Sequence, residues 1–222
     1  GLGDVYKRQV DILSGATVSH STQVIKQLTG GPYTIDNKGT IEASNVTSHG
    51  EAILLEVGTS VENSGLITTN GSANVNGLNF ENNSGTNLLT NSGTIQSDTS
   101  GNYGGGIVIN EASVSEIINT STGTIRVIDS SVNSAPIRVN TGGVVNKIEN
   151  DGTISATGSK HSRGIISINS GIINQLINTG TISAQGGSNS NHGIAIWNNS
   201  GTNLTNTGSI SGTGGSTSYG IR

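Results

Sequence analysis

Two acidic residues, Asp36 and Glu62, occupy equivalent places in the chain, each directly before the asparagine of a repeated motif. Retaining glycosidases use two carboxyl groups about 5 Å apart, and stacked repeats bring equivalent side chains to about that distance. A solvated surface position explains both carboxylates more simply, because Lys38 lies close enough to relieve their charge. Glu149 and Asp151, which flank another motif asparagine, are explained in the same way. We therefore predict that the chain has no catalytic residues and is not an enzyme.

Three of the four histidines, His49, His161 and His192, lie just before an apolar segment. A zinc site would need two or three histidines at matched positions together with a carboxylate or thiolate. The offsets do not match, since His161 lies three residues before the next glycine and His192 only one. No acid accompanies them, and the chain has no cysteine. The sequence therefore favours solvated turns, with no metal and no cofactor.

The same turns carry a few aromatic residues that have no obvious place in a core. Tyr103 and Tyr219 lie near the histidines, and Trp197 ends an apolar segment. Exposed aromatic rings can pack against the faces of sugars, although isolated rings are more often part of ordinary surface packing. We take His161, His192, Trp197 and Tyr219 as weak binding candidates.

The composition excludes several classes of protein. Of the 222 residues, 34 are glycine and only six are aromatic, while charged residues make up 11% and the net charge is −4. A compact α/β enzyme and a charged disordered chain both have other compositions. A slightly acidic chain without clustered Lys and Arg is not expected to bind nucleic acid. No run of 18 apolar residues is present, so no membrane-spanning helix is expected.

A motif of the form Asn-x-Gly-Thr-Ile recurs along the chain and sets its organisation. Its glycines are separated by 26, 28, 30, 29, 28 and 28 residues. The seven copies are NKGTI at Asn37, NSGLI at Asn63, NSGTI at Asn91, STGTI at Ser121, NDGTI at Asn150, NTGTI at Asn178 and NTGSI at Asn206.

Each period contains three short segments with the alternating pattern of a β-strand. In the first segment, one face carries Ile41, Ile67, Ile95, Ile125, Ile154, Ile182 and Ile210. Strands this short cannot bury a face alone, but coiling the chain so that each period stacks on the last joins equivalent strands in parallel ladders. We predict an all-β fold, a right-handed parallel β-helix of about seven turns with three strands per turn. Its interior holds the isoleucine column, and the motif asparagines form a ladder of stacked amides.

Repeats that read I-x-N-x-G-T-I-x-A, then a polar loop, then G-I-x-I resemble the passenger region of bacterial autotransporters. The resemblance covers about residues 33–222. It implies export through the outer membrane by a C-terminal β-barrel translocator in the parent protein. It also implies a passenger that is secreted or displayed at the bacterial cell surface, where its partners would be glycans or proteins of a host or a neighbouring cell.

The first residues lack the Gly-, Asn- and Ile-rich composition of the repeats. Residues 4–9 read DVYKRQ, which back-translates to GATGTGTATAAGAGACAG and resembles a transposase adapter used in sequencing libraries. We predict that residues 1–9 are a non-native artefact of this kind and that 10–32 form an irregular or partial first turn. Residues 33–222 are predicted to form a single β-helix domain, truncated at both ends.

Three functions are compatible with such a solenoid. The leading one is a non-enzymatic autotransporter passenger fragment that acts in adhesion or surface interaction. A carbohydrate-active β-helix enzyme, either a polysaccharide lyase or a hydrolase, would need clustered acids and bases on one face. An ice-binding solenoid would need a flat double column of threonines. One such column is present, at Thr40, Thr94, Thr124, Thr153 and Thr181, but its neighbour varies through Glu42, Gln96, Arg126 and Ser155.

Overall fold

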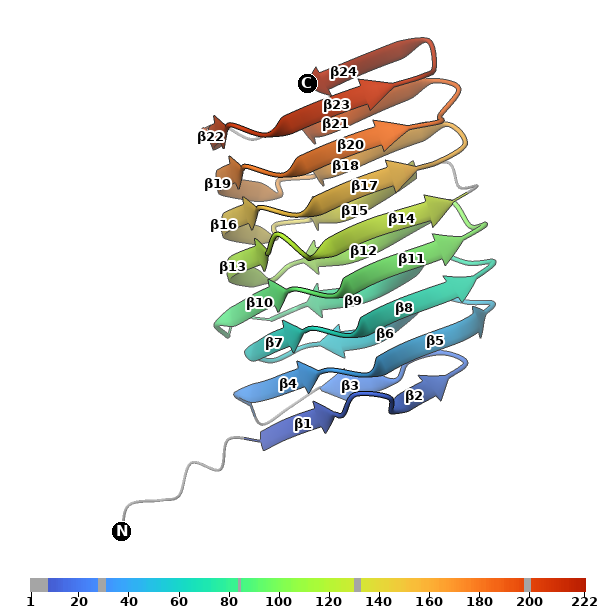
Figure 1. The fold of residues 1–222 in the computed structure, drawn as a ribbon, viewed down its shortest axis with the longest axis vertical. Helices are drawn as coiled ribbons and strands as arrows, with labels where there is room; N and C mark the ends of the chain where they lie inside the picture. Colours follow the sequence, from blue (N-terminus) through green and yellow to red (C-terminus); the bar gives the residue numbers. More distant parts are fainter. Residues whose placement is uncertain (1–7, 28–30, 84, 130–132, 198–200) are drawn as a thin grey trace.

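The computed structural model describes residues 8–27, 31–83, 85–129, 133–197 and 201–222, and within them it is an all-β solenoid. Twenty-four strands form three parallel sheets of eight strands each, and consecutive strands enter the three sheets in turn. In Figure 1 the chain runs left to right along the front, returns behind and climbs towards the C-terminus, so the coil is right-handed. The predicted architecture is confirmed.

Sheet A begins each turn and contains the strands that lead into the motif asparagines. They are β1 (Arg8–Ile12), β4 (Tyr33–Asn37), β7 (Thr59–Asn63), β10 (Asn87–Asn91), β13 (Ser113–Asn119), β16 (Val144–Asn150), β19 (Ile172–Asn178) and β22 (Asn203–Asn206). Sheet B contains the strands that follow the motif glycines. They are β2 (Thr17–His20), β5 (Thr40–Val46), β8 (Leu66–Gly71), β11 (Thr94–Thr99), β14 (Thr124–Asp129), β17 (Thr153–Thr157), β20 (Thr181–Gln185) and β23 (Ser209–Thr213).

Sheet C closes each turn after the polar loop. Its strands are β3 (Ile25–Gln27), β6 (Gly50–Leu55), β9 (Val75–Glu81), β12 (Tyr103–Asn110), β15 (Asn133–Asn140), β18 (His161–Ser167), β21 (Ser190–Ile196) and β24 (Thr217–Ile221). Among the described residues no helix is long and apolar enough to cross a membrane.

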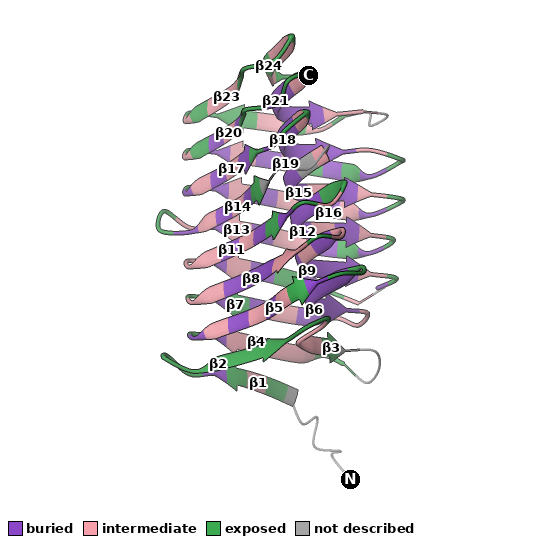
Figure 2. Ribbon diagram, turned by 90° about the vertical axis from the view of Figure 1, so that its right-hand side faces the viewer, coloured by how far each residue is buried: buried purple, intermediate pink, exposed green. Residues whose placement is uncertain are grey.

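The register of sheet B confirms the predicted isoleucine column. Ile154 lies opposite Ile182, and Ile95 lies opposite Ile125. The column is fully buried from Ile41 to Ile182, and Ile210 is partly buried in the last turn. Alternation along each strand sends every second residue inward, so the three sheets supply one continuous apolar interior. Figure 2 shows buried segments within the strands of successive turns, except in β1 and β2 at the N-terminal end, which are mostly exposed.

A turn without the motif precedes the seven that carry it. Residues 8–27 contribute one strand to each sheet: β1 pairs with β4, β2 with β5 and β3 with β6. The described part of this turn is less enclosed than later ones, because β2 is exposed along its whole length (Figure 2). Strand β1 begins at Arg8, so the last two residues of the segment assigned to the adapter lie in the first strand.

The motif asparagines form the predicted amide ladder through the rod. Each Nδ2 donates to the Oδ1 of the asparagine one turn further on, over 2.7–2.8 Å, along Asn37, Asn63, Asn91, Asn119, Asn150, Asn178 and Asn206. All but Asn206 are buried. Asn119 was not among the predicted members, because the fourth motif reads STGTI and its asparagine lies two residues earlier, at the end of β13.

The motif glycines are required for space and not for an unusual backbone angle. At Gly65, Gly93 and Gly180 a Cβ atom would overlap the carbonyl oxygen of the motif glycine one turn earlier. None of these glycines has a positive φ, so they do not form left-handed corners. The ladder asparagines likewise have ordinary φ angles. Both residues of the motif therefore serve the close stacking of turn on turn.

Replacing Ile182 by Asp should unfold more than one turn. The substitution buries a charge with no partner in a stack whose stability is shared between neighbours. We expect the free energy of unfolding to fall by more than about 4 kcal/mol, with loss of amide hydrogen-exchange protection around Ile154 and Ile210. The control is Ser183→Asp, which places the same charge on the outward face of the same strand. Equal effects of the two variants would contradict the assignment of the interior.

Replacing Asn150 by Ala tests the ladder. Asn150 Nδ2 donates to Asn178 Oδ1, and Asn150 Oδ1 accepts from Asn119. Its removal leaves buried partners unsatisfied, so we expect a loss of about 1–3 kcal/mol in chemical denaturation. The control is Asn174→Ala, since Asn174 Nδ2 donates to Asn146 Oδ1 at 3.0 Å in an exposed pair, also one turn apart. That loss should stay within about 0.5 kcal/mol.

Candidate functional site

The acidic pair on sheet A lies in register as the sequence predicts. Asp36 on β4 is opposite Glu62 on β7, at the edge of a depression of about 280 Å³. Lys38 Nζ lies 2.5 Å from Asp36 Oδ2, and this hydrogen bond and ion pair raise the pKa of Lys38. Glu62 is exposed. A glycosidase acid must be kept protonated by burial or by a neighbouring negative charge. Here Asp36 is paired with a lysine and Glu62 is open to solvent, so the geometry matches a surface ion pair.

Glu149 and Asp151 also have surface partners. Lys147 Nζ bridges Glu116 and Glu149, at 2.8 and 2.5 Å, and these bonds raise its pKa well above the usual value. Asp151 Oδ1 accepts a hydrogen bond from the hydroxyl of Thr179. Both carboxylates therefore have neutral or cationic partners at the surface.

The two C-terminal histidines belong to different columns of sheet C. His161 lies opposite Ser190 and its Nδ1 is 3.2 Å from the Ser190 hydroxyl, whereas His192 lies opposite Arg163. Burial, and then the charges of Arg163 and Lys160, lower the pKa of His161. No group of three His, Cys, Asp or Glu residues that would hold a metal ion occurs in the part of the chain that the structure describes.

His192 and Tyr219 come together on the outer face of sheet C. They are opposite each other on β21 and β24, and their rings stack with centroids 5.6 Å apart and planes at 13°. Tyr219 is 50% exposed, but His192 is fully buried and neither of its ring nitrogens has a hydrogen-bond partner among the described residues. Burial, followed by the charges of Arg163, Arg222 and His161, lowers the pKa of His192.

Arg163 and Trp197 extend this cluster. The guanidinium of Arg163 lies over the indole of Trp197, 4.9 Å from the ring centroid, which is a cation–π arrangement. Trp197 also packs on a small apolar cluster outside the main core, formed by Ala135, Ile166 and Ala195. The outward face of sheet C is therefore partly apolar at this end of the rod.

Arg138 and Arg163 share a hydrogen-bond partner, Asn133. Arg138 Nη2 donates to the backbone oxygen of Asn133 at 2.9 Å, and Arg163 Nη1 donates to the side-chain oxygen of Asn133 at 3.1 Å. Arg138 also lies over the ring of Tyr103, 5.2 Å from its centroid. Desolvation and the charge of Arg163 lower the pKa of Arg138 to about 10. Desolvation and the charge of Arg222 lower the pKa of Arg163 to about 10 as well. We call Tyr103, Arg138, Arg163, His192, Trp197 and Tyr219 the sheet C patch.

A groove of about 400 Å³ runs along one side of the sheet C patch. It is lined by His49, Asn74, Asn76, Tyr103, Val108, Arg138, Asn140, Ile168 and Asn169. These residues come from several turns, since Val108 is on β12 and Arg138 on β15. The groove thus combines an aromatic ring, a guanidinium and amide side chains on a rigid surface.

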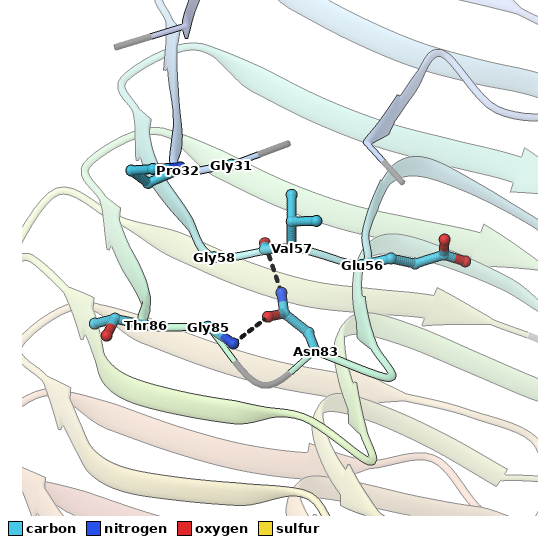
Figure 3. Close-up of a pocket in the computed structure, with 8 residues that line it drawn as sticks. All are labelled: Gly31, Pro32, Glu56, Val57, Gly58, Asn83, Gly85 and Thr86. Carbon is cyan, nitrogen blue, oxygen red and sulfur yellow. Dashed lines mark hydrogen bonds between the residues drawn. The ribbon is translucent and has the colours of Figure 1, made fainter. Parts of the chain in front are cut away.

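A larger hollow, of about 550 Å³, lies at the corner between sheets C and A. Figure 3 shows Asn83 pointing into it, with its amide already bonded to the backbone at Val57 and Gly85. The other lining residues are Gly31, Pro32, Glu56, Gly58 and Thr86. One carboxylate among backbone and apolar groups offers little chemistry, so this hollow is a feature of the corner.

The threonine column considered for ice binding is interrupted. Thr40, Thr94, Thr124, Thr153 and Thr181 do share one column of sheet B. Leu66 stands between the first two, however, and the neighbouring outward column includes Glu42, Gln96 and Arg126. The surface is therefore not the flat double row of hydroxyls that ice binding needs.

Three of the four predicted binding residues, His192, Trp197 and Tyr219, belong to the sheet C patch, and His161 lies at its edge. Sequence reasoning did not include Arg138 or Arg163 in the site. The signal for Arg138 was present in the alternation of β15, because Ile137 and Val139 point inward and so Arg138 points outward.

In comparisons with family models, curated proteins and solved structures, none matches this chain. The resemblance to autotransporter passengers therefore rests on the repeat itself, and function has to be argued from the chemistry of the surface.

The lowered pKa of His192 predicts a stability that depends on pH. The unfolded chain binds a proton near pH 6.5, before the folded chain does, so the free energy of unfolding should decrease as the pH falls below that value. Above it, both states are neutral and His192 contributes nothing. We expect His192→Phe, which keeps a ring against Tyr219, to reduce this loss in urea denaturation between about pH 7 and 5.5. Tyr219→Phe is the control and should keep the pH dependence of the unsubstituted chain.

Proposed function

We propose that this chain is a non-enzymatic, surface-displayed or secreted β-solenoid of the autotransporter passenger type. In this role it acts in adhesion or surface interaction, at the bacterial cell surface or outside the cell after passage through the outer membrane. Its partners are glycans or proteins of host or neighbouring-cell surfaces. The sheet C patch is the surface that binds them.

One observation carries this proposal: aromatic rings gather on one face of a stiff rod with a buried guanidinium group, Arg163, and a half-buried one, Arg138, that are in no ion pair among the described residues. Within the patch, Arg163 is only 7% exposed, while Tyr103 and Tyr219 are about half exposed. Polar groups held in fixed positions next to apolar rings are typical of binding sites. The strands beneath hold these side chains in place, so binding loses little conformational entropy.

The stacked architecture also supports a mechanical role. Every described turn except the first and last is paired on both sides in three sheets, which resists bending and separation. A rod of this kind presents its lateral face at a distance from whatever anchors it. Adhesion needs both properties, a stiff spacer and a lateral binding surface.

The rival reading, a glycan-cleaving β-helix enzyme, has one observation in its favour, the register of Asp36 with Glu62. The two proposals differ in whether the chain cleaves polysaccharides. We expect the 222-residue chain to release no reducing ends or unsaturated uronates from neutral and acidic polysaccharides, because Asp36 is paired with Lys38 and Glu62 is exposed. Release that disappears in Asp36→Asn or Glu62→Gln would replace this proposal with the enzyme.

The binding role is tested on an array of cell-surface glycans and extracellular proteins. We expect the labelled chain to bind a subset of the array and Trp197→Ala to lower that binding at least fivefold, since Trp197 supports the patch. Asp36→Asn, on a different sheet, is the control and should bind like the unsubstituted chain. No binding to any member of the array, by a chain whose circular dichroism shows folded β-structure, would contradict the proposed function.

A further inference from the structure

Arg138 and Arg163 carry charges that none of the described acidic side chains neutralises. Three ion pairs are present among the described side chains, and neither arginine takes part in any of them. The Nε atoms of both are buried and have no hydrogen-bond partner there. Their only hydrogen bonds within the described residues go to the neutral oxygens of Asn133. Buried charges in proteins are normally paired, so two unpaired guanidinium groups side by side are exceptional.

The acidic residues of the same face lie on the N-terminal side of the two arginines, and Glu81 on β9 is two strands from Arg138. Glu51 on β6 shares its outward column with Asn76 on β9 and Gly105 on β12. In sheet order Glu51 lies three strands from Arg138 and four from Arg163. At about 4.8 Å per strand these separations are about 14 and about 19 Å, beyond the screening length of about 8 Å at physiological salt. The face is therefore polarised along the rod. In its N-terminal half, burial raises the pKa of Glu81, and the negative charges of Glu51 and Glu56 raise it further.

The chemistry of the two arginines specifies the missing partner. A guanidinium is planar, stays charged at neutral pH and binds carboxylate or sulfate oxygens through two parallel N–H groups. In each arginine the Nε–H has no acceptor among the described residues, so the guanidinium group is left without its full set of hydrogen bonds. An acid bound here would supply the countercharge that the fold itself does not.

The surroundings favour an anion carried on a sugar. The groove of about 400 Å³ places Tyr103 and Val108 beside Arg138, and the amides of Asn74, Asn76 and Asn140 along its wall. Apolar ring faces accommodate the C–H faces of a pyranose, and amides exchange hydrogen bonds with its hydroxyls. Tyr219, half exposed two strands beyond Arg163 in sheet order, offers a second ring further along the rod.

We propose that the sheet C patch binds an acidic polysaccharide, with carboxylate or sulfate groups on Arg138 and Arg163 and sugar rings on Tyr103 and Tyr219. This inference rests on the proposed function and specifies its ligand class. Repeating acidic sugars suit a site that extends over several turns, because successive units contact successive strands. Glu51, in register with Asn76 of the groove, repels the polymer at the N-terminal side, so the polymer extends from the groove towards Arg163 and Tyr219.

The binding experiment uses the 222-residue chain with three oligosaccharides of matched length: an oligogalacturonate, a sulfated heparin oligosaccharide and a neutral maltooligosaccharide. By calorimetry we expect at least one acidic oligosaccharide to bind at least tenfold tighter than the neutral one, with affinity that weakens as salt is raised. The two acidic arms distinguish carboxylate from sulfate recognition. Equal affinity for all three would overturn the proposal.

The variants separate this site from general charge attraction. We expect Arg138→Gln and Arg163→Gln each to lower the affinity for the acidic oligosaccharide at least tenfold. The matched control is Arg126→Gln on sheet B, which removes the same charge from an arginine already bonded to Gln96 at 2.9 and 2.6 Å. Its affinity should stay within twofold of the unsubstituted chain. Equal losses in all three variants would assign the binding to net charge and overturn the site.

A direct measurement on the unsubstituted chain covers the case of a variant that does not fold. The ¹⁵N–¹H signals of the arginine Nε groups should shift for Arg138 and Arg163 on addition of the acidic oligosaccharide and stay unchanged for Arg126. If these signals do not move, the inference fails. If the array experiment finds neutral glycans or acidic peptides bound instead, the proposed function stands and the polysaccharide assignment is overturned.

Discussion

The register of one turn on the next is the constraint on which the rest of this structure depends, and the buried amide ladder fixes it. An apolar column alone would tolerate a slip of two residues, because the same face would still point inward. A buried amide tolerates no slip, since its donor and acceptor are both satisfied only when another amide lies directly above and below. From Asn63 to Asn178 each described ladder member has both neighbours, and its Nδ2 also bonds to backbone oxygens at the corner. A single polar column thus decides the positions of the apolar columns beside it.

The same register determines the surface. Once Asn150 lies under Asn178, the alternation of the following strands fixes which outward residues become neighbours across about 4.8 Å. Arg163 and His192 are 29 residues apart in sequence, and His192 and Tyr219 are 27 apart. They are nevertheless neighbours on successive strands of sheet C, because the turns differ in loop length and not in strand register. The motif glycines contribute by allowing adjacent corners to approach closely. The loops can vary because they lie outside this stack.

The sequence was sufficient for the fold and only partly for the site. The spacing of the motif glycines gave the turns, and alternation gave the inward residues, since both are local properties repeated seven times. Asn119 was missed because the repeat was aligned on its glycine, and the fourth corner has two extra residues between asparagine and glycine. The pairing of Asp36 with Glu62 was predictable for the same reason as the fold. The importance of Arg138 and Arg163 was not, because it comes from the lack of acids on neighbouring strands and from buried Nε atoms, which only the three-dimensional register reveals.

The division between interior and surface explains why the sheet C patch can hold groups that weaken the fold. Apolar side chains, each worth about 1.5–3 kcal/mol when buried, fill the interior on all three sheets, and the amide ladder is satisfied without help from the outer face. The stability of such a stack is distributed over the turns, so a local cost at β15, β18 and β21 is spread over their neighbours. Unpaired guanidinium groups and a buried histidine without hydrogen bonds are tolerated there for that reason. Groups that oppose folding and are held in place by a scaffold that does not need them are typical of a site kept for binding.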